Sequence, residues 1–88
     1  MNTSELLKKL TDVFDEYMED QFGRAKLPFV EAIPICAEFR VVRIAQRRGW
    51  SFVRVPTEHD GFMSSALYRF KPPGWTVEQD QMLKDVAA

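Results

Sequence analysis

The chain has 88 residues and a net charge of −1, which fits one domain over residues 1–88 and excludes two. Hydrophobic residues make up 45% of it, including seven Phe, enough for one core, which excludes a disordered chain. The only cysteine, Cys36, excludes an intrachain disulfide, and no apolar run approaches the roughly 18 residues of a membrane span, so we expect a cytoplasmic protein without membrane contact.

The first predicted element is an amphipathic helix that begins near Asn2 and ends near Gly23. Asn2 followed by Glu5 resembles a capping box, with Ser4 as an alternative cap, and glycine is typical of a helix C-terminus. Apolar residues recur between these ends at intervals of three and four, the period of a helix with one apolar side. These residues are Leu6, Leu10, Val13, Phe14, Tyr17 and Met18.

A second helix is predicted between Pro34 and Gly49. Proline suits the first turn of a helix, and glycine suits the position just after the last turn. Residues 27–32 are compatible with one helical turn from Pro28 or with an extended connector. A break before Pro34 is expected, because the residue that precedes a proline avoids helical φ and ψ angles.

This central helix has a basic stripe and a wide apolar arc. The stripe contains Arg40, Arg43 and Arg47. The arc, which we expect to face the core, contains Ile35, Phe39, Val41, Val42, Ile44 and Ala45. Phe39→Ala should then lower stability by about 3–5 kcal/mol, whereas Arg43→Ala should change it by no more than about 0.5 kcal/mol.

Two strands, residues 50–55 and 66–71, are predicted after Gly49 because both are rich in aromatic and β-branched residues. A two-residue turn at Asp60 and Gly61 would join them as a hairpin. The pairs on its apolar face would be Val53–Tyr68, Val55–Ala66 and Ser51–Phe70. The other face would interleave aromatic residues and cations through the pairs Trp50–Lys71, Phe52–Arg69 and Arg54–Leu67.

A short C-terminal helix is predicted after the turn of residues 72–74, because Thr76 and Gln79 form a capping box. Its expected apolar side contains Val77, Met82, Leu83 and Val86. The predicted fold is therefore a small α+β domain with a long N-terminal helix, a central helix, a two-stranded antiparallel hairpin and a short C-terminal helix.

The motifs of common enzymes are missing from the chain. Its four glycines are isolated, so they form no phosphate-binding loop. His59 is the only histidine and stands in a predicted turn, and Cys36 lies near the arginine stripe but is best read as a packing residue. We therefore expect no catalytic residue, no metal, no cofactor and no enzyme activity.

Uneven charge leaves two candidate binding surfaces. Residues 1–22 carry a net charge of −4, residues 23–56 carry +5 and residues 57–88 carry −2. The acidic row of the first helix contains Asp12, Asp15, Glu16, Glu19 and Asp20. The basic face contains Arg40, Arg43, Arg47, Arg48, Arg54, Arg69 and Lys71. A third candidate is the loop pair Phe62 and Met63, because apolar residues there either tuck under the loop or contact a partner.

Charged helix faces are often only solvated, and the arginines are then paired with carboxylates of the same chain. We expect intermolecular contacts instead, because two helices packed through apolar arcs direct their polar faces apart. Charge reversal of Asp12, Glu16 and Glu19 together should then leave the melting temperature nearly unchanged and abolish binding to a partner or to a second copy.

The predicted function is that of a small non-catalytic adaptor or inhibitor that binds a protein partner through these charged faces, with a homodimer as a further option. The order helix, helix, hairpin also resembles a winged helix-turn-helix, with residues 34–48 as the recognition helix and residues 56–65 as the wing. This resemblance implies nucleic-acid binding through the basic face as the alternative. Salt-sensitive retention on heparin or DNA that Arg43→Glu abolishes would favour that alternative.

Overall fold

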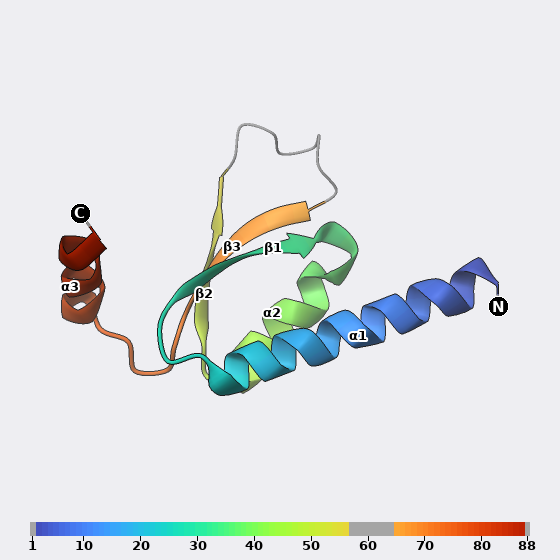
Figure 1. The fold of residues 1–88 in the computed structure, drawn as a ribbon, viewed down its shortest axis with the longest axis horizontal. Helices are drawn as coiled ribbons and strands as arrows, with labels where there is room; N and C mark the ends of the chain where they lie inside the picture. Colours follow the sequence, from blue (N-terminus) through green and yellow to red (C-terminus); the bar gives the residue numbers. More distant parts are fainter. Residues whose placement is uncertain (1, 57–64, 88) are drawn as a thin grey trace.

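A computed structural model describes residues 2–56 and 65–87 of the chain (Figure 1). The elements in order are α1 (Thr3–Arg24), β1 (Phe29–Pro34), the 3-10 turn η1 (Ile35–Ala37), α2 (Glu38–Arg47), β2 (Ser51–Val55), β3 (Ser65–Lys71) and α3 (Val77–Ala87). This order confirms the predicted α+β fold. It also adds a third strand, because the segment before Pro34 is extended and pairs with β3.

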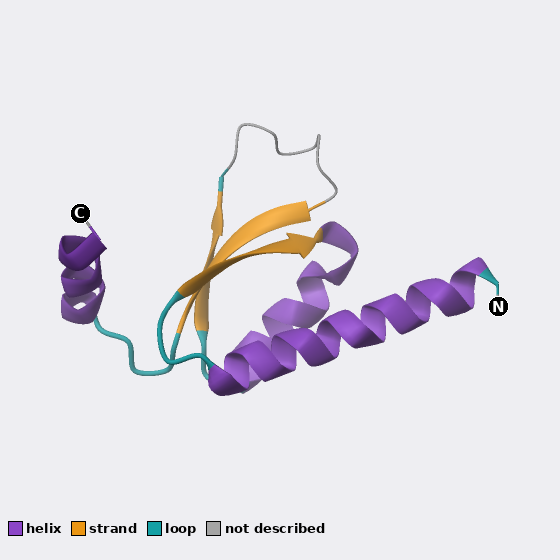
Figure 2. Cartoon of the chain, in the orientation of Figure 1, coloured by secondary structure: helices purple, strands orange, loops and turns teal. Residues whose placement is uncertain are grey.

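The three strands form one antiparallel sheet in the order β1-β3-β2. Since β1 and β2 both pair antiparallel with β3, they run parallel to each other, and the connection through α2 crosses over the middle strand. Helices α1 and α2 lie on the same side of the sheet (Figure 2). The core lies between this helical layer and the sheet.

The register of the β2–β3 hairpin differs by one residue from the predicted one. Phe52 faces Phe70, Arg54 faces Tyr68 and Val53 faces Arg69. A shift of one residue exchanges the two faces of a strand, so the predicted pairs of both faces are wrong. The observed register brings Phe52 and Phe70 together on the helix-covered face. The predicted turn at Asp60 and Gly61 lies outside the described residues.

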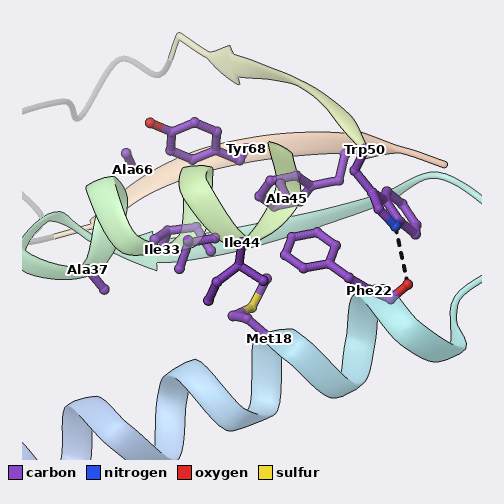
Figure 3. Packing of buried hydrophobic residues seen from close by; sticks show 11 residues of the cluster. Met18, Phe22, Ile33, Ala37, Ile44, Ala45, Trp50, Ala66 and Tyr68 are labelled. Carbon is purple, nitrogen blue, oxygen red and sulfur yellow. Dashed lines mark hydrogen bonds between the residues drawn. The ribbon is translucent and has the colours of Figure 1, made fainter. Parts of the chain in front are cut away.

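An aromatic cluster forms the centre of the core. The ring of Phe70 lies 4.9 Å from that of Phe22 and 5.3 Å from that of Phe29. Trp50, predicted on the opposite face of the hairpin, is buried in this cluster, and its Nε1–H donates to the Phe22 carbonyl at 3.2 Å (Figure 3). That carbonyl is in the last turn of α1, where intrahelical partners run out. Trp50 therefore anchors the end of α1 on the core.

Helix α2 ends as its glycine predicts. Gly49 has a φ of 78°, its N–H donates to the Gln46 carbonyl at 3.1 Å, and the Trp50 N–H donates to the Ala45 carbonyl at 2.9 Å. This pair of bonds is a Schellman motif, which favours glycine because its first residue beyond the helix has a positive φ. The start of the helix is corrected, since Pro34 ends β1 and η1 intervenes before Glu38.

The prediction that Phe39 is buried is wrong, because this residue is 72% exposed. Helix α2 buries only the narrow side that contains Val41, Ile44 and Ala45. Ile35 and Phe39 belong to the predicted apolar arc, but they lie beyond the part of the arc that the sheet and α1 cover. The large destabilisation predicted for Phe39→Ala is therefore not expected.

Candidate protein-interaction surface

The acidic row and the basic face meet along the α1–α2 contact. The Arg40 Nε–H donates to the Asp15 carboxylate at 3.1 Å, and the Arg48 Nε–H donates to that of Glu19 at 2.7 Å. Arg47 reaches Glu19 at 3.5 Å. Asp15, Glu19, Arg47 and Arg48 line an open groove of about 600 Å³ between the helices. The expectation that the two rows are not intramolecular partners is therefore wrong for these residues.

The reason is that the polar flanks of two crossing helices converge on one side of their contact. Gly23 contributes, because a Cβ at this position would lie 3.3 Å from the Arg48 Nη1, and its absence leaves room for that guanidinium to reach Glu19. Gly23 does not end α1 as predicted, since the helix continues to Arg24. Arg24 pairs with Asp20 one turn away.

These exposed or half-exposed pairs contribute little stability, about 0–1 kcal/mol each. Asp12 and Glu16 have no ion-pair partner among the described residues. The predicted triple charge reversal therefore mixes two kinds of position. Reversal of Glu19 places a cation against Arg47 and Arg48, so the expectation of an unchanged melting temperature no longer applies to it.

Arg54, another residue of the basic face, forms an ion pair with Glu38. The Glu38 carboxylate pairs with Arg54 at 3.5 Å and accepts a hydrogen bond from the Tyr68 hydroxyl at 2.7 Å. Burial, together with this carboxylate, raises the pKa of Tyr68 above its ordinary value of 10.0. Arg54 therefore belongs to a bonded group at the N-terminus of α2.

Arg69 and Lys71 bind Asp80 of α3. Arg69 Nη2–H donates to the Asp80 carboxylate at 2.8 Å, Lys71 Nζ donates at 3.4 Å and the Trp75 Nε1–H donates at 3.3 Å.

The predicted capping box is confirmed, since Thr76 and Gln79 exchange bonds of 2.9 and 3.1 Å.

The predicted apolar side of α3 is not buried. Val77, Met82 and Val86 are exposed, and Leu83 is only half-buried. The helix stands apart from α1 and α2 (Figure 1). Asp80, only 8% exposed, is the one buried polar or charged residue among those that the structure describes. Its ion pairs therefore take the place of apolar packing in docking this helix.

Acid should release α3. Burial raises the pKa of Asp80, but the hydrogen bonds from Trp75 and Lys71 and the charge of Arg69 lower it by more. The pKa of Asp80 is therefore held below its ordinary value of 3.8. A depressed pKa means that the carboxylate stabilises the docked helix above its ordinary pKa, and that this contribution is lost as the pH falls through the folded-state pKa. Asp80→Asn should show the same release at neutral pH. Faster hydrogen exchange of the α3 amides measures it, with Asp85→Asn, an exposed change on the same helix, as the control. Unchanged α3 exchange in Asp80→Asn would contradict this role.

Arg43 is the member of the basic face that has no carboxylate partner among the described residues. Its guanidinium instead lies over the Phe39 ring, 5.3 Å from the ring centroid. Phe39 also lines an open cleft of about 340 Å³ with Ile35 and Val42. The outer side of α2 therefore presents an exposed aromatic ring, an arginine and an adjoining apolar cleft.

A second exposed apolar surface runs along α1. Leu6, Leu10, Val13 and Tyr17 were predicted to belong to the apolar side of the helix, but they are exposed, and so is Leu7 beside them. The lengths of the elements explain this exposure. The 22 helical residues span about 33 Å, whereas a six-residue strand spans about 20 Å, so more than a third of α1 extends past the sheet. Hydrogen bonding to the Glu31 carboxylate raises the pKa of Tyr17, so this ring lies beside β1.

Cys36 was predicted to be a partly buried packing residue, but it is exposed. With Leu7, Leu10 and Pro34 it lines an apolar cleft of about 300 Å³ between α1 and η1. Within residues 2–56 and 65–87, His, Cys, Asp and Glu side chains form no group of three or more that could hold a metal ion. None of the described helices is long and apolar enough to span a bilayer.

The loop candidates Phe62 and Met63, and His59, lie outside the described residues. The winged-helix comparison lacks one feature, since α1 and α2 are joined through β1 and η1 and not by the short turn of a helix-turn-helix. Comparisons with protein-family models, with curated proteins and with solved structures find no match to this chain.

Proposed function

We propose that the protein is a small non-catalytic adaptor or inhibitor that binds a protein partner through the outer side of α2, with Phe39 and Arg43 at the centre of the contact. The observation that supports this is the exposed ring of Phe39 under the Arg43 guanidinium. Aromatic residues and arginine are enriched at protein interfaces and carry much of their binding energy. The single cysteine supports a cytoplasmic setting as part of the same proposal.

Nucleic-acid binding through the basic face is the second candidate, supported by the exposure of Arg43 and Arg47. It is the weaker one, because Arg40, Arg47 and Arg48 each face a carboxylate of α1. Phosphate contact would have to displace those carboxylates and would place the polyanion beside the acidic row. A protein surface that buries an aromatic ring has no such conflict.

A photo-crosslinking side chain at position 39 tests the proposal in cells of the source organism. We expect a crosslink to another protein that Arg43→Glu weakens at least about tenfold, the effect of losing one well-placed interface arginine. The same crosslinker in place of Val77, which is exposed on α3, should give no such product. Because Phe39 is exposed, Phe39→Ala should leave the free energy of unfolding within about 1 kcal/mol of wild type and should lose the partner.

A second measurement separates the two candidates. Fluorescence anisotropy of a labelled DNA duplex at low salt should show little binding by the wild type. Salt-dependent DNA binding that Arg43→Glu abolishes, without a protein crosslink at position 39, would replace the proposed function by the nucleic-acid alternative. Equal crosslinking at positions 39 and 77 would also contradict it, because the surface of α2 would then not be selective.

A further inference from the structure

An apolar stripe that the core does not use runs from the first half of α1 to Tyr17, just beyond the middle of the helix. Leu6, Leu10, Val13 and Tyr17 are between 45% and 64% exposed. Their spacing of four, three and four residues is that of the a and d positions of a heptad repeat, which place a narrow apolar stripe against a second helix. These four residues are called the α1 seam.

The fold leaves most of the α1 seam uncovered, and Tyr17, at its C-terminal end, is the seam residue that lies beside β1. Met18 and Phe22, in the second half of the helix, are the buried residues of α1. The first half projects past α2 and the sheet, as Figure 1 shows. The seam is also separate from Phe39 and Arg43, which lie on α2.

The two flanks of the α1 seam differ in chemistry. On one flank lie Lys9 and Glu16, and on the other lie Leu7 and Phe14. Neither Lys9 nor Glu16 has an ion-pair partner among residues 2–56 and 65–87. One flank thus offers a cation and an anion separated by one heptad, which is a self-complementary arrangement.

Antiparallel pairing with a second α1 matches this arrangement. If Leu10 faces Val13 of the second copy, the axis of symmetry crosses the helix between them, and Lys9 comes within about 3 Å along the helix axis of the second copy's Glu16. Symmetry produces the same ion pair twice. In a parallel pair, Lys9 would face the opposite flank at Phe14, and neither charge would be matched.

We propose that a second copy of this chain binds the α1 seam in antiparallel orientation, so that the protein is a two-fold symmetric dimer. The seam and Leu7 expose on the order of 500 Å² of apolar surface per copy, so the dimer would bury about 1,000 Å² in total, the size at which a specific interface becomes stable. The surface of α2 with Phe39 remains free for the proposed partner, so the two proposals can fail separately.

Sedimentation equilibrium of the full chain tests the dimer. The wild type should sediment as a dimer that dissociates on dilution, and Val13→Asp should weaken it at least about tenfold, because it places a charge in the apolar seam. Val53→Asp is the matched control, since Val53 is similarly exposed but lies on the sheet. Circular dichroism of both variants should give the wild-type helical signal, as a check that they are folded. A wild type that is monomeric throughout would overturn the proposal, and so would a dimer that only Val53→Asp dissociates.

Disulfide crosslinking in a Cys36→Ser background tests the orientation. Leu6→Cys chains mixed with Tyr17→Cys chains should crosslink to each other, because these positions face each other in the antiparallel dimer. Leu6→Cys alone should not crosslink, since its two copies would be about 16 Å apart along the axis. Self-crosslinking of Leu6→Cys would show a parallel pair and overturn the proposal.

Charge exchange on the flank gives an independent check. Lys9→Glu should weaken the dimer roughly fivefold, because two exposed ion pairs become repulsive contacts. Adding Glu16→Lys to Lys9→Glu should restore wild-type affinity, since the pair is only inverted. A double variant weaker than Lys9→Glu alone would exclude the proposed pairing of these flanks.

Discussion

Replacing Phe70 by alanine should lower the free energy of unfolding by about 3–5 kcal/mol, the usual effect of removing a large core aromatic. Phe70 is completely buried on the middle strand, and its ring lies 4.9 Å from that of Phe22 and 5.8 Å from that of Tyr68. Small domains have a total stability of about 5–15 kcal/mol, so this change removes a large part of it. Urea unfolding followed by circular dichroism measures the loss.

Phe39→Ala is the matched control for this change. The same side chain is removed, but Phe39 is exposed and its main contact is with Arg43, so stability should change by no more than about 1 kcal/mol. Equal losses in the two variants would mean that α2 packs through a different side from the one described. The comparison also decides between the arc expected from the helical period and the narrower one observed.

The second large effect is expected for Met18→Ala, which should cost about 2–5 kcal/mol. Met18 is completely buried, and Figure 3 shows it pointing from α1 toward Ile44 of α2. Its removal leaves a cavity between the two helices, because a close-packed core relaxes only partly around a deleted side chain. Thermal unfolding at several protein concentrations measures the effect and separates it from self-association.

Met82→Ala is the matched control, since this methionine is exposed on α3 and should change stability by no more than about 0.5 kcal/mol. A loss at Met82 as large as that at Met18 would contradict the inference that α3 is docked mainly through Asp80, which Arg69 binds. A negligible loss at Met18 would mean that α1 is not held to the core by its second half.

The candidate site was only partly accessible from the sequence. The charged residues of both helices were predicted, but their pairing was not, because Asp15 and Arg40 are 25 residues apart and meet only where α1 and α2 cross. Phe39 and Arg43 are only four residues apart, and their contact was missed because Phe39 was expected to be buried. An aromatic residue in an apolar arc is usually buried, and only the width of the neighbouring elements shows that this one is not.

The sequence by itself determined the start of α1, the end of α2 and the cap of α3. Asn2 accepts a bond from the Glu5 N–H, Gly49 ends α2, and Thr76 and Gln79 cap α3, all as predicted. Such signals act between residues no more than about four positions apart, so they hold whatever the rest of the chain does. The α+β class followed from the change of apolar period after Gly49.

Only the tertiary structure decided the strand register, the third strand and the buried side of each helix. A one-residue shift between β2 and β3 leaves every local preference satisfied, and what selects the register is the fit of Phe52 and Phe70 under the helices. Likewise, one side of α1 is apolar along most of its length, but its buried residues, Met18 and Phe22, both lie in its second half. The free energy of burial depends on which surfaces are brought together, and a periodic pattern states only which surfaces are available.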